Sequence, residues 1–276
     1  MKQSSILDSF FTRKRVPMVV STTVDKTVGD EKKQVMVKIS RQLSPTAIID
    51  YYQHFLNDKE QESLYHHLLD DPTVQWQQGK YKGMVLPRML WSMRDEPMVS
   101  SVTAIAKPKE YQQYTGTGFS IWTEPVKKIK LRIEQMFSVT LTYCQMNWYR
   151  NGKDYINWHP DRELVPGDSI YSLSLGCTRT FLVKPKEVVA RSSDTKPYDD
   201  LTVTTTNVID EKKTIRDDDK SLKILKNISA TETMFRLEPG SLLVMNYEAG
   251  NKDFLHSLKK EPSISKGRIN ITFRVK

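Results

Sequence analysis

The last eight residues of the chain before its terminal lysine alternate between apolar and polar side chains, the period of a β-strand. The segment RINITFRV (268–275) presents one wholly apolar face. Its opposite face carries Arg268, Asn270, Thr272 and Arg274. An isolated strand would turn such a face to water, but this one ends a half of the chain that reads as strands throughout. We therefore predict a barrel whose lumen is polar.

The same period runs through residues 139–149, where one face changes from apolar to polar as it approaches Asn147 and Tyr149. That face carries Val139, Leu141, Tyr143, Gln145, Asn147 and Tyr149. Further strands are expected at 170–177, 179–183 and 237–247, with short strands and loops over 72–123. The fold class is therefore mainly β with flanking helices (α+β).

Helical spacing of apolar residues predicts helices in the N-terminal half. One is expected over 45–56, and a second begins near Asp58, where Gln61 three residues later resembles a capping box. A third begins after Thr123, with its apolar stripe formed by Val126, Ile129, Ile133 and Phe137. His54, His66 and His67 fall on these predicted helices, which leaves His159 and His256 in the strand-rich half.

Two polar segments lack a periodic apolar face. Residues 1–40 are predicted to be a flexible, disordered basic tail, followed by one domain over 41–276. A polar insertion at about 185–232, which contains the run DEKKTIRDDDK, is predicted to be a mobile loop.

The composition of the chain indicates the kind of partner and the cellular compartment to expect. The chain has 276 residues, 38% hydrophobic content and a net charge of +9, which favours an anionic partner such as nucleic acid. Its two cysteines, Cys144 and Cys177, form no CxxC motif, so no disulfide scaffold is expected. No apolar run approaches a membrane span, and we expect a soluble intracellular protein without membrane contact.

The candidate chemistry lies in NWYRNGKDYINWHPD (147–161) and the distal His256. His159, Asp161 and His256 offer two imidazoles and one carboxylate, the set that holds non-haem Fe(II) with open positions. The same set can hold zinc in a hydrolase. Arg268 and Arg274 lie about 20 Å apart along an extended strand, so they would grip opposite regions of a site. An acidic co-substrate held by one of these arginines favours iron and a keto acid over zinc.

A second motif lies in the tail. In SSILDSFF (4–11), Leu7 precedes Phe10 and Phe11 and a basic run follows, as in peptides that dock on DNA sliding clamps. Ser4 stands where such peptides normally carry Gln. The alternative is a chance apolar cluster, and the basic run alone is also typical of nuclear import.

The order of motifs resembles the AlkB family of Fe(II)/2-oxoglutarate dioxygenases, in its DNA-repair branch and like the nuclear AlkB homologues. The matching pieces are NWY, HPDRE, SLSLGCTRTF, PGSLLVMN, HSL and RINITFR. The resemblance implies a double-stranded β-helix, or jelly-roll, that uses Fe(II), 2-oxoglutarate and O₂.

Residue by residue, the resemblance makes His159, Asp161 and His256 the catalytic iron ligands. The positions around 2-oxoglutarate are Asn147, Tyr149, Arg268, Asn270, Thr272 and Arg274. One of the two arginines should pair with the distal carboxylate, and the sequence leaves open which. Glu163 and Arg88 match positions near the flipped, methylated base, although Arg88 read from the sequence alone is equally a surface residue. Tyr114, Phe119 and Trp122 are candidates for an aromatic finger that fills the base gap.

The implied activity is oxidative demethylation of N-alkylated DNA bases, such as 1-methyladenine and 3-methylcytosine, with release of formaldehyde. We expect a nuclear monomer acting on single- or double-stranded DNA. The alternatives are an RNA or protein demethylase of the same chemistry, and a clamp-tethered nucleic-acid-binding module without catalysis.

Overall fold

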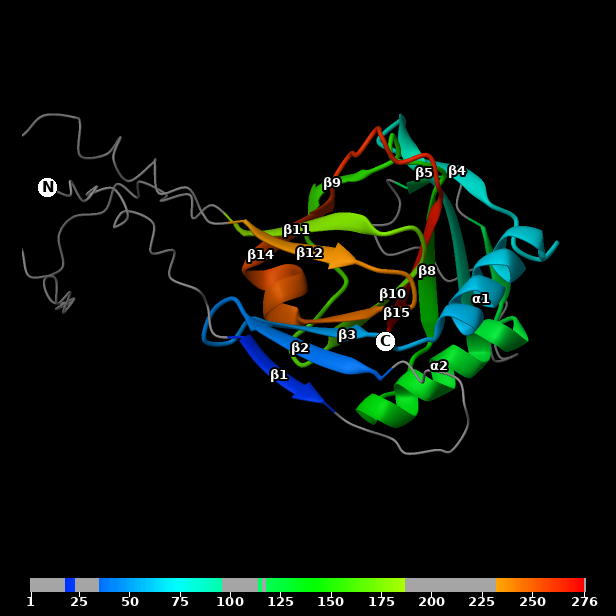
Figure 1. The fold of residues 1–276 in the computed structure, drawn as a ribbon. Helices are drawn as coiled ribbons and strands as arrows, with labels where there is room; N and C mark the ends of the chain where they lie inside the picture. The colour runs from blue at the N-terminus through cyan, green and yellow to red at the C-terminus, as the bar shows by residue number, and fades with distance from the viewer. Residues whose placement is uncertain (1–17, 23–34, 96–113, 116–117, 187–231, 276) are drawn as a thin grey trace, which may run out of the picture.

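Two antiparallel β-sheets face each other in this computed structural model, which describes residues 18–22, 35–95, 114–115, 118–186 and 232–275 (Figure 1). The large sheet has the strand order β1-β2-β3-β13-β10-β15-β8-β5-β4-β6, and β7 pairs with β5 in parallel. The small sheet has the order β12-β11-β14-β9. This is the jelly-roll barrel that the sequence predicted.

The strands of the large sheet are β1 (Met18–Thr22), β2 (Val37–Gln42), β3 (Ile48–Gln53), β4 (Gln77–Tyr81), β5 (Met84–Arg94), β6 (Tyr114–Thr115), β7 (Phe119–Ile121), β8 (Tyr143–Tyr149), β10 (Ser169–Gly176), β13 (Leu242–Asn246) and β15 (Arg268–Arg274). Those of the small sheet are β9 (Ile156–His159), β11 (Arg179–Pro185), β12 (Thr233–Leu237) and β14 (Phe254–Leu258). The helices are α1 (Asp58–Asp70) and α2 (Glu124–Phe137), and a π-helical turn, η2 (Glu248–Lys252), precedes β14.

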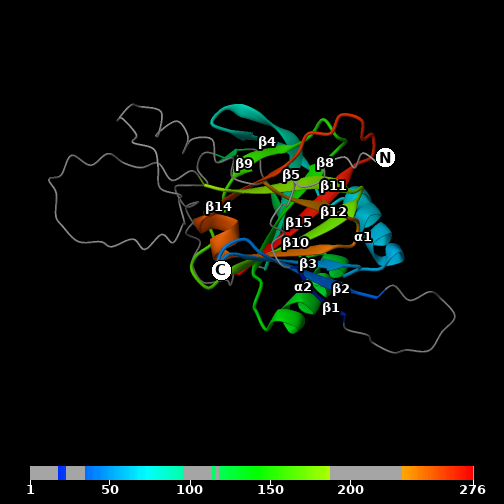
Figure 2. The same cartoon turned by 60° about the vertical axis from the view of Figure 1, so that its left-hand side comes forward.

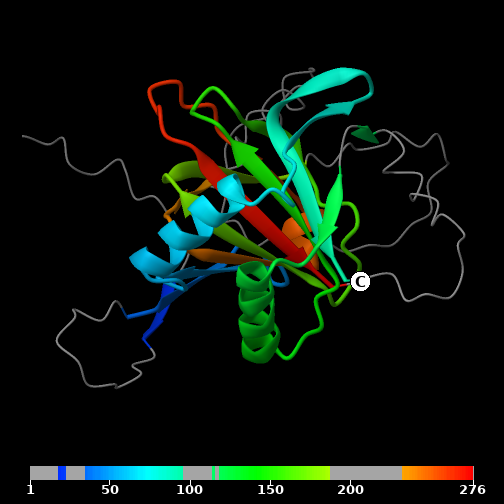
Figure 3. The ribbon, with the colours of Figure 1, turned by 90° about the vertical axis from the view of Figure 1, so that its right-hand side faces the viewer.

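Helices α1 and α2 cover the outer face of the large sheet, opposite the small sheet (Figures 1 and 3). Leu64 and Leu68 of α1 and Val126 and Ile133 of α2 are buried in one core cluster with Ile269 and other outward residues of the large sheet. Burial of this apolar stripe is what fixes the helices, at about 25 cal/mol per Å² removed from water. The stripe predicted for residues 124–137 is confirmed.

A second cluster fills part of the space between the two sheets. It combines Tyr51 of β3 and Leu243 of β13 with Phe181, Val183 and Leu258 of the small sheet. The barrel lumen is therefore apolar on the side of β3 and β13. The polar side chains of β15 and β8 lie on the other side of the same space.

Two predictions in the N-terminal half were wrong. Residues 45–56 contain strand β3 and its flanking turns instead of a helix, and His54 sits in a turn with φ of 54°. Strand β3 pairs with both β2 and β13 and is buried on both faces, so its apolar residues run together and imitate a helical stripe. The helix that does form begins one residue earlier than predicted, because Asn57 and Glu60 make its capping box.

The tail boundary at residue 40 was also placed too late. Strands β1 and β2 extend the large sheet from within the predicted tail (Figure 2). Lys38 and Ser40 of β2 both bind the Asp50 carboxylate of β3, at 2.7 and 2.5 Å. The clamp residues Leu7, Phe10 and Phe11, and nearly all of the 185–232 insertion, lie outside the described residues.

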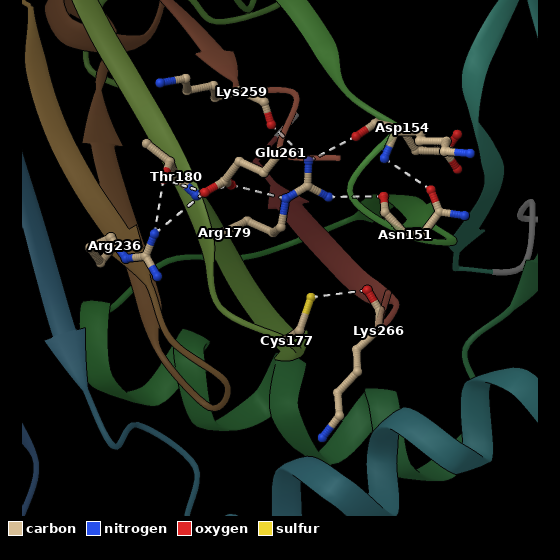
Figure 4. A network of polar contacts seen from close by, with 10 residues as sticks. Asn151, Asp154, Cys177, Arg179, Thr180, Arg236, Lys259, Glu261 and Lys266 are labelled. Atoms are coloured by element: carbon tan, nitrogen blue, oxygen red, sulfur yellow. Dashed lines mark hydrogen bonds and ion pairs between the residues drawn. The ribbon is translucent and has the colours of Figure 1, made fainter. Parts of the chain in front are cut away.

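One buried arginine ties the loops at one end of the barrel together. Arg179 of β11 is fully buried and donates to the backbone carbonyls of Asn151, Asp154 and Lys259, and to the Glu261 carboxylate at 3.2 Å (Figure 4). Glu261 also accepts from the amide and hydroxyl of Thr180. The network joins the turn after β8 to the loop between β14 and β15.

Glu261→Gln should lower the free energy of unfolding at neutral pH by about 3 kcal/mol, because it leaves the buried Arg179 charge without its partner. Although burial alone would raise the pKa of Glu261, its bonds to Thr180 and Arg179 lower that pKa below the ordinary 4.5. Its stabilising contribution is therefore present above pH 4.5 and lost as the pH falls through the lowered value. Urea unfolding between pH 3 and 7 should show the two proteins converging in acid.

The matched control is Glu124→Gln, because Glu124 makes only an exposed pair with Lys127 at 3.9 Å. It should change stability by less than about 1 kcal/mol. Equal effects of the two substitutions would contradict a structural role for the Arg179 network.

Candidate active site

Three metal-ligand side chains meet at the edge of the small sheet. His159 at the end of β9 and His256 of β14 are direct partners across the two strands, and Asp161 follows in the next turn. Their candidate ligand atoms all lie within 4.8 Å of one another. The amide of Asp161 donates to the Gly250 carbonyl of η2 at 2.9 Å, which fixes the turn. The sequence-predicted triad is thus assembled from two segments more than ninety residues apart.

The protonation states suit metal binding, which requires neutral imidazoles and an ionised carboxylate. Burial, followed by the nearby His256, lowers the pKa of His159 to about 3. Burial alone would raise the pKa of Asp161, but His256 and Arg274 beside it lower that pKa below its ordinary value. His159 is therefore neutral and Asp161 ionised near pH 7.

A β-bulge orients the first histidine. From Ile156 to His159 strand β9 advances three residues, while their partners Leu258 and His256 are two residues apart on β14. The extra residue lets both Ile156 and His159 face inward. The Asn157 carbonyl lies 2.8 Å from Nδ1 of His159, which sets the tautomer and leaves Nε2 to face a metal.

The polar face of β15 lies inside the barrel, as the sequence predicted. Asn270 donates to the Ser172 hydroxyl of β10 at 2.7 Å, and Thr272 donates to Asn270 at 3.0 Å. All three residues are buried. These bonds form a fixed polar wall between β10 and β8.

Arg268 is a buried cation without a carboxylate partner. It is 2% exposed, its Nη2 donates to the Ser174 hydroxyl at 2.9 Å, and its Nε has no hydrogen-bond partner. The Tyr149 ring lies 5.5 Å from the guanidinium carbon. None of the ion pairs in the described part of the chain includes this residue. Burial lowers the pKa of Arg268 to about 10, which still leaves it charged at neutral pH.

Arg274 has a different environment at the other end of β15. Its Nη2 lies 3.3 Å from Asp161 Oδ1, and its Nη1 pairs with Glu163. The two arginines are therefore not equivalent. Arg274 is held by acidic groups beside the metal ligands, whereas Arg268 presents its charge to the lumen, as an anionic ligand would require.

The remaining predicted site residues also lie in this region. Arg88 of β5 is buried and donates through Nε to the Asn147 side chain at 2.8 Å. Its charge is close enough to contribute to the lowered pKa of His159. Tyr149 is 2% exposed and packs between Arg268 and the second core cluster. The predicted positions on β5, β8 and β15 thus lie near the triad, and Glu163 reaches Arg274 from the turn after β9.

The three candidates for the aromatic finger, Tyr114, Phe119 and Trp122, have different environments. Trp122 packs against Phe273 in the outer core and donates to Asp95 at 2.7 Å, so it is a structural residue. Phe119 is 52% exposed, with the guanidinium of Arg94 over its ring. The side chain of Tyr114 lies outside the described part.

Sequence reasoning missed Ser172 and Ser174, which support Asn270 and Arg268. Their period-two spacing inside SLSLGC was the available signal, because two serines on one face of a buried strand require polar partners. It also missed Asn157, whose role is carried by a backbone carbonyl and leaves no residue-type signal.

Comparison with known proteins identifies the family to which this chain belongs. The model of the 2OG-Fe(II) oxygenase superfamily matches residues 49–274. The Arabidopsis thaliana protein named DNA oxidative demethylase ALKBH2 is 29% identical over 82% of this chain and 65% of its own length, just under two thirds. Mouse alpha-ketoglutarate-dependent dioxygenase alkB homolog 3 is 26% identical over 99% of this chain and 81% of its own length. Human DNA oxidative demethylase ALKBH2 is 25% identical over 58% of this chain and 51% of its own length.

The chain therefore belongs to the 2OG-Fe(II) oxygenase superfamily, and the relatives it is similar to are AlkB homologues. The donor set of His159, Asp161 and His256 fits Fe(II), and the unpaired charge of Arg268 fits the dicarboxylate 2-oxoglutarate. The enzyme is a dioxygenase that uses Fe(II), 2-oxoglutarate and O₂. Neither α1 nor α2 is long and apolar enough to cross a membrane.

Replacing any one of His159, Asp161 and His256 by Ala should weaken Fe(II) binding at least about 100-fold, since even the loss of a residue that only hydrogen-bonds to a metal ligand costs roughly 10- to 100-fold. Anaerobic equilibrium dialysis against Fe(II) measures this directly. The control is His66→Ala, because His66 is exposed on α1 and should leave the affinity unchanged. Wild-type affinity in any of the three triad variants would remove that residue from the site.

Proposed function

We propose that this enzyme demethylates N-alkylated bases in DNA, of the 1-methyladenine and 3-methylcytosine type, and releases formaldehyde. One observation carries the reaction class: a buried, unpaired arginine and a His-Asp-His triad share one barrel lumen. The choice of DNA is supported by the names of the relatives, which include DNA oxidative demethylases, and by a net charge of +9.

Each side chain has a distinct part in this proposal. His159, Asp161 and His256 hold Fe(II). Arg268 pairs with the distal carboxylate of 2-oxoglutarate, because it has no acidic partner of its own while Arg274 has two. Asn147, Tyr149, Asn270 and Thr272 line the rest of the co-substrate site. When bound together, iron, 2-oxoglutarate and O₂ supply the oxidation that hydroxylates the N-methyl carbon, and the hydroxymethyl product loses formaldehyde.

The protein contributes orientation and the exclusion of water. Phe181 packs 5.5 Å from the His256 ring, and Phe254 and Leu258 continue the apolar wall beside the triad. Apolar side chains lower the effective dielectric constant beside the triad, which strengthens the electrostatic contacts there. Arg88 is close enough to His159 to affect its pKa, and Glu163 shares Arg274 with Asp161, so we assign both residues near the triad to contacts with the flipped base.

Location and partners complete the proposal. We place this enzyme in the nucleus, where the SSILDSFF segment would bind the sliding clamp through Leu7, Phe10 and Phe11. A pull-down with the clamp, compared between the full chain and a Phe10→Ala, Phe11→Ala variant, addresses this contact separately from catalysis.

Incubation with oligonucleotides that carry 1-methyladenine or 3-methylcytosine should release formaldehyde in equal amount to the 2-oxoglutarate consumed. The same lesions should be offered in single-stranded DNA, duplex DNA and RNA, since 2′-hydroxyl recognition separates the two nucleic acids. Asp161→Ala serves as the catalytically inactive control. Turnover of RNA alone would reassign the substrate, and no turnover of either lesion on any strand would refute the proposed function.

A further inference from the structure

The bulge that orients His159 has a second consequence for the strand that carries it. It lets Ile156 and His159 both face the lumen, although two residues separate them, and the second of these, Trp158, lies on the opposite face. Lys184 shows which face this is. Phe181 and Val183 of β11 point into the core between the sheets, so Lys184 points outward, and its Nζ lies 4.7 Å from the centroid of the Trp158 ring.

Trp158 differs from every other tryptophan of the chain. The chain has five, and the other four belong to or pack against the outer core cluster. Trp158 belongs to neither core cluster of the described part and is partly exposed, and the ammonium group of Lys184 lies over its ring. An indole of this size on a surface, paired with a cation, is suited to binding by stacking.

A second aromatic side chain with a lysine beside its ring lies immediately before strand β9. Tyr155, also partly exposed, has the Nζ of Lys260 5.5 Å from its ring centroid. Its amide donates to the Pro87 carbonyl at 3.2 Å, next to the site residue Arg88. The segment that leads directly to the metal ligands therefore carries two aromatic side chains, each with a lysine from another part of the chain beside its ring.

Strand β9 is also an edge strand. It is the last member of the small sheet and pairs only with β14 among the described strands. Figures 1 and 2 show β9 on the side of the barrel away from α2. An extended chain can pass over this open edge from the outer face toward His159, which a central strand would not permit.

We infer that Trp158 and Lys184 form a docking platform for the single strand that flanks the target nucleotide, with a base stacked on the indole and a phosphate on the lysine. This inference rests on the proposed function, because it identifies how that substrate is held. A nucleic-acid strand fits this surface better than an apolar peptide does. Lysines lie beside the rings of Trp158 and Tyr155, and their charges complement phosphates but not aliphatic side chains.

Binding of an unmethylated eight-nucleotide oligothymidylate, followed by fluorescence anisotropy at several salt concentrations, tests the platform without turnover. Trp158→Ala should weaken binding roughly 5- to 100-fold, as loss of one base–aromatic stack does, while Trp158→Phe should restore most of the affinity. Lys184→Ala should reduce the slope of log K against log salt by about 0.7, the value for one phosphate contact on a single strand.

Lys128→Ala is the charge-matched control, because Lys128 is exposed on α2, which lies on the other side of the barrel (Figure 3). It should leave both affinity and salt slope as in the wild type. Indole fluorescence gives a measurement that does not depend on the stability of the Ala variant. Oligothymidylate should quench the wild type and fail to quench Trp158→Phe, since the remaining tryptophans pack against the core.

Unchanged affinity in Trp158→Ala, or equal quenching in the wild type and Trp158→Phe, would overturn the platform. The outcome is separable from that of the proposed function. If the enzyme demethylates DNA but the Trp158 variants bind oligothymidylate as the wild type does, the platform alone is refuted. If binding depends on Trp158 but no demethylation occurs, the reaction is refuted and the platform is retained.

Discussion

The register of β15 is the constraint on which the site depends. The strand lies between β10 and β8, and its residues pair directly as Asn270 with Ser174 and with Asn147. Because side chains alternate strictly along a strand, a slip by one residue would move Arg268 and Arg274 into the helix-covered core and Ile269 and Ile271 into the lumen. The first exchange would bury two charges among apolar groups, and the second would place aliphatic side chains against the polar lumen, so both faces enforce the same register.

This register concentrates charge in a buried space. Asp161 balances Arg274, and Arg88 is held by Asn147, but Arg268 has only a serine hydroxyl and an aromatic ring. A buried cation without a counter-charge costs several kcal/mol relative to a paired one. In the proposed function, the distal carboxylate of 2-oxoglutarate would supply the counter-charge that Arg268 lacks.

Much of this arrangement could be predicted from residue patterns. The alternation of RINITFRV, the two histidines in the strand-rich half and the change of period near residue 139 were sufficient for the barrel and the triad. Strand β3 was misassigned because burial on both faces removes the period-two signal, and β2 was missed because its polar residues Lys38 and Ser40 are satisfied by Asp50. The distinction between Arg268 and Arg274 was out of reach, since it depends on which acidic groups the folded chain brings to each. The outward turn of Trp158 likewise depends on a bulge that is defined by the partner strand.

We propose that β15 holds a dicarboxylate keto acid against the iron triad through Arg268. Anaerobic calorimetric titration of the iron-loaded enzyme with 2-oxoglutarate, and with 2-oxobutyrate, which lacks the distal carboxylate, tests it most directly. The wild type should bind 2-oxoglutarate at least about 10-fold more tightly, as a charge-assisted pair of 1.5–3 kcal/mol requires. Arg268→Met should abolish that preference while Arg132→Met, at an exposed position on α2, retains it. Equal preference in the wild type and Arg268→Met would contradict the account.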